Sequence, residues 1–153
     1  MCKQGPGRPG DTNGGPAVVL RQEFPNDLHQ LPALRAFVRS ACRNAWGAEG
    51  SEEALILLEL AVGEVAANII LHAYKGQKGP PIEVVVDVNQ DRVCVSFYHG
   101  GEDFDPSSAR PPSFDGSRET GFGLYLVEQA VDEVRYGRDD RGRAGIHLVK
   151  SRT

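Results

Sequence analysis

The sequence has little that would build a disulfide scaffold, a zinc site or a membrane anchor. It contains three cysteines, Cys2, Cys42 and Cys94, and no two of them form a CxxC pair. An odd and widely spaced set of cysteines predicts neither a disulfide framework nor a zinc module. No apolar run reaches the roughly 18 residues that a membrane-spanning helix requires. We therefore expect no membrane association.

An excess of basic charge is also missing. Lysine and arginine number 17 against 21 aspartates and glutamates, which gives a formal net charge of -4. A protein that binds nucleic acid through its phosphates usually presents a basic face, so we expect no direct nucleic-acid partner. The first residues also have no apolar segment of the kind found in signal peptides. Together these features predict a cytoplasmic protein.

Glycine and proline, in contrast, are abundant and are concentrated at the start of the chain. Residues 1–16 consist mostly of glycine, proline and polar residues. Such a segment buries too little apolar area to offset its chain entropy, so we predict a disordered tail over residues 1–16. Residues 17–153 have the length of one globular domain, and the whole chain has an ordinary composition of 40% hydrophobic and 25% charged residues.

The patterns of apolar residues after the tail predict strands and helices in a definite order. The predicted elements are a strand over 17–24, a helix from Asn26 or Asp27 to Trp46, a helix capped by Ser51 that ends before Gly76, a hairpin of strands Ile82–Val88 and Arg92–Tyr98, a helix over Gly121–Ala130, and a last strand pair, Glu133–Tyr136 and Gly145–Lys150. This order predicts an α/β (α+β) two-layer sandwich, with a mixed, mostly antiparallel sheet and helices on one face.

The second of these helices carries an unusual line of polar residues. Its apolar positions repeat with the helical period, yet Glu64, Asn68 and His72 are spaced four residues apart and fall on one flank. One interpretation is an ordinary solvated helix face. The other is the lining of a pocket, because apolar residues flank the line and a carboxylate there needs a partner. The residues alone leave both interpretations open.

Two segments that contain glycine follow at positions suited to ligand binding. Thr120 to Leu126 places Gly121 and Gly123 at the start of a predicted helix, where backbone N–H groups form an anion site. His99 to Pro106 follows the second hairpin strand, and Gly101 permits a sharp turn and the close approach of a ligand. Taken singly, each segment is equally explained by a turn or by a loop that enters a helix.

In this order, the three elements resemble the motifs of the GHKL (gyrase and histidine kinase-like) ATPase superfamily, in its anti-sigma-factor serine/threonine kinase branch. Glu64 to Tyr74 resembles the N-box, in which E-x-x-x-N is followed by H-A/G-Y. His99 to Pro106 is similar to the first glycine box, D-x-G-x-x-F-D-P, and Thr120 to Leu126 is similar to the second, G-x-G-L-x-L. The resemblance implies a histidine-kinase-like ATPase domain with a Bergerat-type ATP-binding fold over residues 17–153.

The resemblance also implies a Mg-ATP site and a role for each matched residue. Asn68 would coordinate Mg²⁺, and Glu64 would be the catalytic general base that takes the proton from a serine hydroxyl. The residues implied at the nucleotide are Asn68, His99, Gly101, Thr120, Gly121, Gly123 and Leu124. Residues 107–120 would form the lid over ATP, and the motif assigns no role to Arg110 and Arg118 within it.

At one position the sequence departs from the resembling family. The first glycine box begins with an aspartate that accepts a hydrogen bond from the adenine amino group, and this sequence has His99 instead. A neutral imidazole accepts through one nitrogen but lacks the negative charge of a carboxylate. Having histidine in place of the aspartate is expected to weaken ATP binding by on the order of 2–3 kcal/mol, or about 30- to 150-fold in affinity. Weakened and lost ATP binding are both consistent with it.

Two functions therefore remain open. The first is an anti-sigma-factor-type serine/threonine protein kinase that binds Mg-ATP, sequesters a sigma factor and phosphorylates an anti-anti-sigma protein with a STAS domain; homodimers are common in the resembling family. The second is a non-catalytic regulatory binding module on the same fold, with weakened or lost ATP binding because of His99. A metal-dependent hydrolase that uses Glu64 and His72 is disfavoured, because eight helical residues separate them by about 12 Å.

Overall fold

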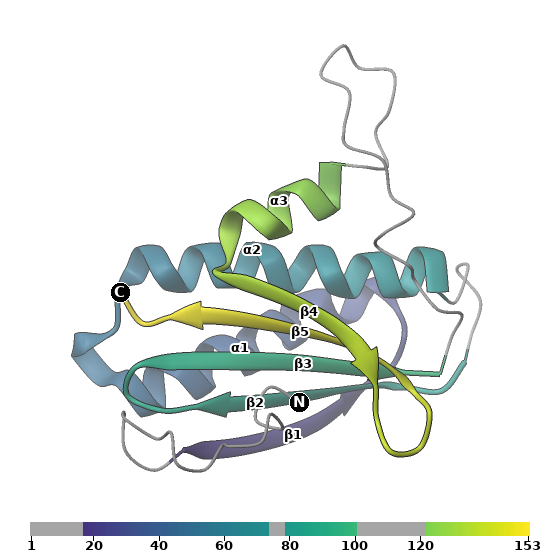
Figure 1. Cartoon of the computed structure of the whole chain (residues 1–153), viewed down its shortest axis with the longest axis horizontal. Helices are drawn as coiled ribbons and strands as arrows, with labels where there is room; N and C mark the ends of the chain where they lie inside the picture. The colour runs from purple at the N-terminus through teal and green to yellow at the C-terminus, as the bar shows by residue number, and fades with distance from the viewer. Residues whose placement is uncertain (1–16, 74–78, 101–121) are drawn as a thin grey trace.

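The structure is a computed structural model, which describes residues 17–73, 79–100 and 122–153 (Figure 1). Its elements are β1 (Val18–Phe24), α1 (Leu31–Trp46), α2 (Glu52–Asn68), β2 (Ile82–Val88), β3 (Arg92–His99), α3 (Phe122–Ala130), β4 (Glu133–Arg138) and β5 (Ala144–Ser151). Short 3₁₀ turns, Leu28–Gln30 and Gly47–Glu49, flank α1, and a π-helical turn, Ile69–Ala73, continues α2. The predicted tail over residues 1–16 lies outside the described residues.

The five strands form one sheet in the order β1-β2-β3-β5-β4. Each of the four strand pairings is antiparallel, so the described sheet contains no parallel pair. Figure 1 shows the helices together on one face of this sheet, with α3 lying on α2. The predicted two-layer α+β sandwich is confirmed.

Local signals in the sequence account for the ends of the elements. The side chain of Ser51 caps α2 by accepting a hydrogen bond from the Ala54 backbone at 3.1 Å. Gly47 follows α1 with a φ of +61°, in the left-handed region that favours glycine. In the β2–β3 turn, Asn89 accepts bonds from the Asp91 and Arg92 backbones through its side chain. The predicted hairpin of β2 and β3 therefore forms, with its turn at Asn89.

The core lies between the sheet and the first two helices. Alternate residues of each strand face the helices, as the two-residue period of a strand requires. The largest fully buried apolar side chains are Phe24, Leu34, Val38, Leu55, Leu58, Val62, Ile69, Ile82, Val84, Phe97 and Leu148. Burying one aliphatic side chain of this size contributes about 1.5–3 kcal/mol, so this layer fixes α2 on the sheet.

A ladder of charged pairs joins the outer surfaces of α1 and α2. The guanidinium of Arg39 pairs with Glu52 and Glu59, and that of Arg43 pairs with Glu52. Hydrogen bonds from Arg39 hold the pKa of the Glu52 carboxyl below its usual value. Exposed pairs of this kind add little stability each, but they align the two helices.

By length and composition alone, the helical segment Glu52–His72 could cross a bilayer, although the sequence shows no unbroken apolar run of that length. More than half of its most apolar window, 56%, is buried inside the protein. This helix therefore packs as the central core helix of the sandwich.

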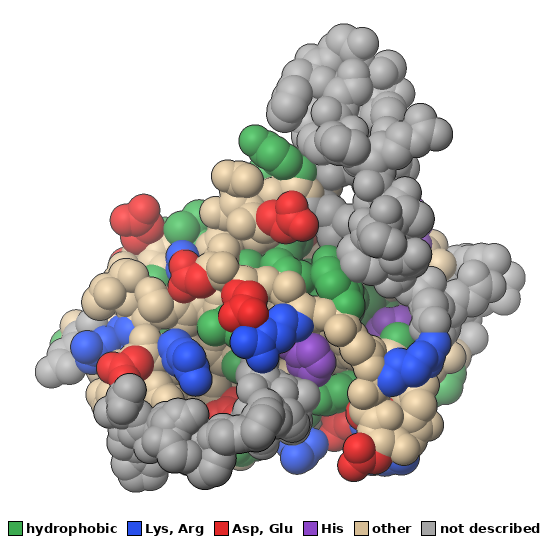
Figure 2. Space-filling model, viewed as in Figure 1, with side chains coloured by type: hydrophobic (Ala, Val, Ile, Leu, Met, Phe, Trp, Pro, Cys, Tyr) green, Lys and Arg blue, Asp and Glu red, His purple; other side chains and the backbone are tan. Residues whose placement is uncertain are grey.

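Charged side chains of both signs are interspersed on the face shown in Figure 2. Arg143 shows how such charges are paired in this protein: it donates to Glu83 and to Asp139, each at 2.8 Å, and lies 5.1 Å from the centre of the Tyr98 ring. Among the residues that the figure colours, basic and acidic side chains are mixed and form no continuous basic stripe.

The side of the sheet opposite the helices holds a buried histidine on β5. His147 points away from the core because its neighbours Ile146 and Leu148 face the helices. Its Nδ1 lies 2.8 Å from the Ser96 hydroxyl, and its ring meets the Tyr98 ring edge-on. Burial lowers the pKa of His147 to about 4, and the positive charge of Arg135 acts in the same direction.

This shift predicts that the fold loses stability in acid. Below about pH 6.5 the unfolded chain binds a proton at His147 that the folded chain binds only near pH 4, so the stability falls through that interval. By pH 4 the loss at this one residue is about 3 kcal/mol. Urea unfolding at pH 7 and at pH 4 should show a smaller acid-dependent loss in His147→Gln than in the unmodified protein. His29→Gln, which changes an exposed histidine, is the control. Equal pH dependence of the stability in all three proteins would contradict the assignment.

Candidate functional site

Glu64 and Asn68 lie one turn apart on a partly exposed flank of α2. The core positions Ala61 and Val65 are fully buried beside them and hold this flank in a fixed orientation. Glu64 and Asn68 are themselves half-buried. Of the two interpretations of the polar line, the partial burial of both side chains favours the lining of a site over a fully solvated face.

The first turn of α3 lies directly against these two side chains. A Cβ atom placed on Gly123 would be 2.8 Å from Glu64 Oε1, and 3.6 and 3.7 Å from the amide nitrogen and oxygen of Asn68. Real Cβ atoms do not approach another heavy atom to 2.8 Å, so a side chain at position 123 would force the end of the flexible Glu64 side chain to move. The structure thus brings Glu64, Asn68 and Gly123 together, across 59 residues of sequence.

Packing of α3 against the core maintains this contact. Val127, Ala130 and the following Val131 are buried and belong to the same core as α2. The carboxylate of Glu64 lies beside the N-terminal turn of α3, where a helix carries unbonded N–H groups and positive partial charge. The site therefore offers a carboxylate, a carboxamide and a helix N-terminus within one small region.

This set of groups suits a metal ion that is shared with a phosphate. Among the described residues, no three His, Cys, Asp or Glu side chains are close enough to form a metal site by themselves. Mg²⁺ commonly takes only one or two protein oxygens and completes its shell with water and phosphate oxygens. The Asn68 carboxamide oxygen fits that role, and a helix N-terminus fits a phosphate.

The helix changes its period directly after Asn68. Residues Ile69–Ala73 form a π-helical turn, a departure that occurs frequently at functional sites. His72 lies in this turn and its side chain is exposed. Of the three polar residues in the line expected from the sequence, Glu64 and Asn68 therefore belong to the candidate site. His72 is a surface residue.

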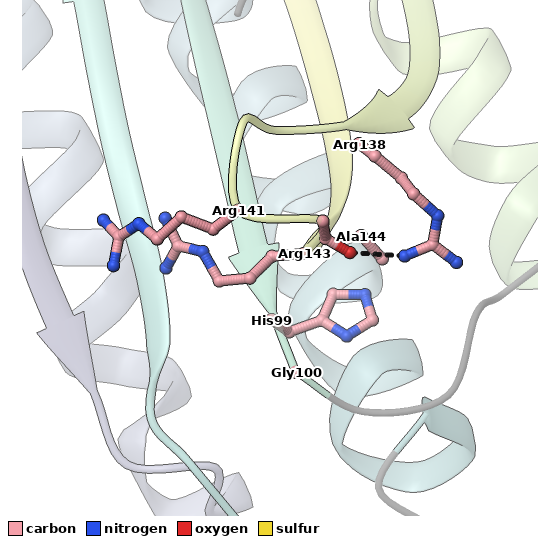
Figure 3. Close-up of a pocket in the computed structure, with 7 residues that line it drawn as sticks. His99, Gly100, Arg138, Arg141, Arg143 and Ala144 are labelled. Carbon is pink, nitrogen blue, oxygen red and sulfur yellow. Dashed lines mark hydrogen bonds between the residues drawn. The ribbon is translucent and has the colours of Figure 1, made fainter.

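A second region, at the end of β3, contains His99. Its side chain is almost fully buried, with 1% of its surface exposed. Ala144 of β5 pairs with His99 on one side and with Arg138 of β4 on the other, so the three residues form one row across the sheet. They line a pocket of about 310 Å³ together with Gly100 and the β4–β5 turn (Figure 3).

Arg138 is one of several residues of this pocket that the sequence did not identify. Its Nη1 donates to the Gly142 carbonyl at 2.5 Å, which fixes it over the β4–β5 turn. In Figure 3, Arg141 and Arg143 extend away from the His99 ring on the opposite side. The sequence shows that the β4–β5 turn is rich in charged residues. That this turn lies close to His99 follows only from the pairing of the strands.

The remaining residues implied at the nucleotide cannot be placed in this site. Gly101, Thr120 and Gly121, like the expected lid over residues 107–120, lie outside the described residues. Leu124 lies in the first turn of α3, and its side chain is not among those described.

Comparisons with known proteins agree with the resemblance in the motifs. Serine-protein kinase RsbW from Bacillus subtilis (strain 168) is 36% identical over 86 residues, which cover 51% of this chain and 54% of that protein. Serine-protein kinase RsbW from Listeria innocua is 28% identical over 135 residues, which cover 80% of this chain and 83% of that protein. The chain thus matches about half the length of the first of these relatives.

The fold and the family agree as well. The crystal structure of the RsbU and RsbW domains of a Mycobacterium tuberculosis protein matches 88% of this chain and 32% of that chain, with a TM-score of 0.61 and 17% identity, which shows a shared fold. The profile of the histidine kinase-like ATPase domain matches residues 24–149, which include all the strands and helices from α1 to β4 and most of β5. The chain therefore belongs to the histidine kinase-like ATPase domain family.

Proposed function

We propose that this protein is a cytoplasmic serine/threonine protein kinase of the anti-sigma type. It binds Mg-ATP, phosphorylates an anti-anti-sigma protein with a STAS domain, and sequesters a sigma factor. The observation that carries the proposal is the contact of Gly123 with both Glu64 and Asn68. Relatives named as serine-protein kinases support the reaction class.

The chemistry of the three residues supports a division of roles. Asn68 would hold Mg²⁺ through its carboxamide oxygen, and the backbone at Gly123 would approach the phosphates without a side chain in the way. The metal, when bound, would neutralise phosphate charge. The Glu64 carboxylate is positioned to accept the proton of an incoming serine hydroxyl. Its position beside the α3 N-terminus keeps the base and the phosphate-binding backbone close together.

His99 favours a second candidate function, a regulatory module that binds its partner without catalysis. The residue at this position should accept a hydrogen bond from the adenine amine, and His99 shares its row with the cationic Arg138. A neutral imidazole is a weaker acceptor than a carboxylate because it lacks the negative charge. If the protein has this second function, it should bind nucleotide weakly or not at all.

Removal of the proposed base tests the kinase function. Glu64→Gln keeps the shape of the side chain but cannot take a proton, so we expect phosphate transfer to fall by roughly 100-fold or more. The measurement is the transfer of radiolabelled phosphate from ATP to a purified STAS-domain protein. Glu53→Gln, in the exposed first turn of the same helix, is the matched control. Full activity in Glu64→Gln, or equal loss in both variants, would exclude Glu64 as the base.

A methyl group at Gly123 should disturb the nucleotide site. The added Cβ would push the carboxylate of Glu64 away from the α3 N-terminus, and a loss of about 1 kcal/mol of binding free energy corresponds to roughly fivefold in affinity. We expect Gly123→Ala to bind a fluorescent ATP analogue correspondingly less tightly. Gly137→Ala is the control, because a Cβ there meets nothing within 4 Å. Unchanged binding in Gly123→Ala would contradict a role for the close packing of Gly123 on Glu64 in nucleotide binding.

Restoring the carboxylate at the end of β3 separates the two functions. If the pocket beside Ala144 receives adenine, His99→Asp should raise the affinity for ATP by about 30- to 150-fold. Competition against the fluorescent analogue measures the change, with His29→Asp on the surface as the control. No gain would favour the regulatory module over the kinase.

A further inference from the structure

The pocket at the end of β3 lies on the helix side of the sheet. Alternate residues of β3 from Val93 to Phe97 are fully buried against the helices, and His99 is the next residue in this alternation. Figure 1 shows that β3 and α2 end on the same side of the domain, where α3 begins. The pocket and the candidate site at Asn68 therefore lie at the same end of the molecule.

The size of this pocket suits one ring system rather than a whole nucleotide. Its volume of about 310 Å³ is at the lower end of the range for ligand pockets, which is roughly 300–1,000 Å³. A nucleotide that is held by its phosphates near Asn68 carries its base, a flat and compact ring, at the other end. The base is therefore the part of a nucleotide that this pocket can receive.

Most hydrogen-bonding side chains of the pocket are donors. Its described lining combines His99 with the arginine-rich β4–β5 turn and contains no aspartate or glutamate. The guanidinium of Arg138 has five N–H groups and no acceptor, and its bond to the Gly142 carbonyl comes from one nitrogen, Nη1. In Figure 3 this guanidinium and the His99 ring extend to the same side, whereas Arg141 and Arg143 extend to the other. A neutral imidazole adds one N–H, so the described pocket offers its ligand mainly donors.

Purine bases differ in what they present to such donors. Adenine carries an amine at carbon 6, which donates, whereas guanine and hypoxanthine carry a carbonyl oxygen there, O6, which accepts. An arginine side chain donates to O6 and N7 of guanine at once, and this pairing discriminates well against the wrong base. Against adenine, the same guanidinium would face another donor, and a buried N–H group would lose its acceptor. A pocket built from donors therefore favours a purine with a 6-keto group.

We propose that the pocket of His99 and Arg138 selects a 6-keto purine nucleotide, with guanine or hypoxanthine as its base, over an adenine nucleotide. This selection rests on the proposed function, because it assumes that the phosphates lie at Asn68 and Gly123. His99 donates to O6 through its N–H, and Arg138 donates to O6 and N7. ATP is a weaker ligand of the same site, since among the described side chains of the pocket only the His99 imidazole can accept from the adenine amine.

Calorimetric titration of the full chain with GDP, inosine diphosphate and ADP, each with Mg²⁺, tests this preference. Inosine diphosphate differs from GDP only in lacking the 2-amino group, so it isolates the effect of the group at carbon 6. We expect GDP and inosine diphosphate each to bind about tenfold or more tightly than ADP. Equal affinity for the three, or tighter binding of ADP, would overturn the base preference and leave the nucleotide site in place. No binding of any of the three would contradict the proposed function, and the base preference with it.

Two substitutions assign the preference to these side chains. His99→Asp provides a carboxylate that accepts from the adenine amine and repels O6, so ADP should become the tightest of the three ligands. Arg138→Met keeps much of the length of the side chain without its donors, so the advantage of GDP over ADP should fall to about threefold or less. The readout is the ratio of the two affinities, which a general disturbance of the structure does not change.

Arg135→Met is the matched control for Arg138→Met. Arg135 lies on the same strand but opposite His147 in the sheet register, so it faces away from the helices, and its side chain pairs with Glu133. Its ratio of GDP to ADP affinity should equal that of the unmodified protein, and thermal unfolding verifies that each variant is folded. An unchanged ratio in either His99→Asp or Arg138→Met would overturn the assignment of base selection to this pair.

Discussion

The contact between Gly123 and the Glu64 carboxylate is the constraint on which the site depends. It joins the first turn of α3 to the flank of α2 so closely that a Cβ at position 123 would displace the end of the Glu64 side chain. The contact exists because both helices are anchored separately, α2 through its stripe of leucines and valines on the sheet and α3 through Val127 and Ala130. A carboxylate, a carboxamide and a helix N-terminus meet as a result of that packing.

The helix α2 serves two purposes. Its buried side holds the sandwich together, and its flank toward α3 carries Glu64 and Asn68. Because both surfaces belong to one rigid helix, the packing of the core fixes where Glu64 and Asn68 lie.

Much of this arrangement could be predicted from the sequence, because its signals are local. Helical spacing identified α1 and α2, Ser51 marked the start of α2, and Asn89 marked the hairpin turn. The polar spacing on α2 and the glycines before α3 identified Glu64, Asn68 and Gly123 as candidates. Their proximity was expected from the resembling family and appears in the structure; their chemical roles remain proposals.

The rest depended on pairings between distant residues, which no local pattern encodes. The insertion of β5 between β3 and β4 places Arg138 in the row of His99 and Ala144, and strand order cannot be read from residue spacing. The close approach of Arg35 to the backbone at Gly63 likewise depends on how α1 lies across α2. The π-helical turn after Asn68 also has no signature in the sequence that separates it from α-helix.

The central claim is that the Glu64, Asn68 and Gly123 region receives a magnesium-bound nucleotide. Calorimetric titration of the unmodified protein with ADP, in the presence of Mg²⁺ and again with the metal chelated, tests it most directly. The account predicts saturable binding of one nucleotide per chain that weakens strongly when Mg²⁺ is removed. An absence of heat at millimolar ADP, with and without Mg²⁺, would contradict it.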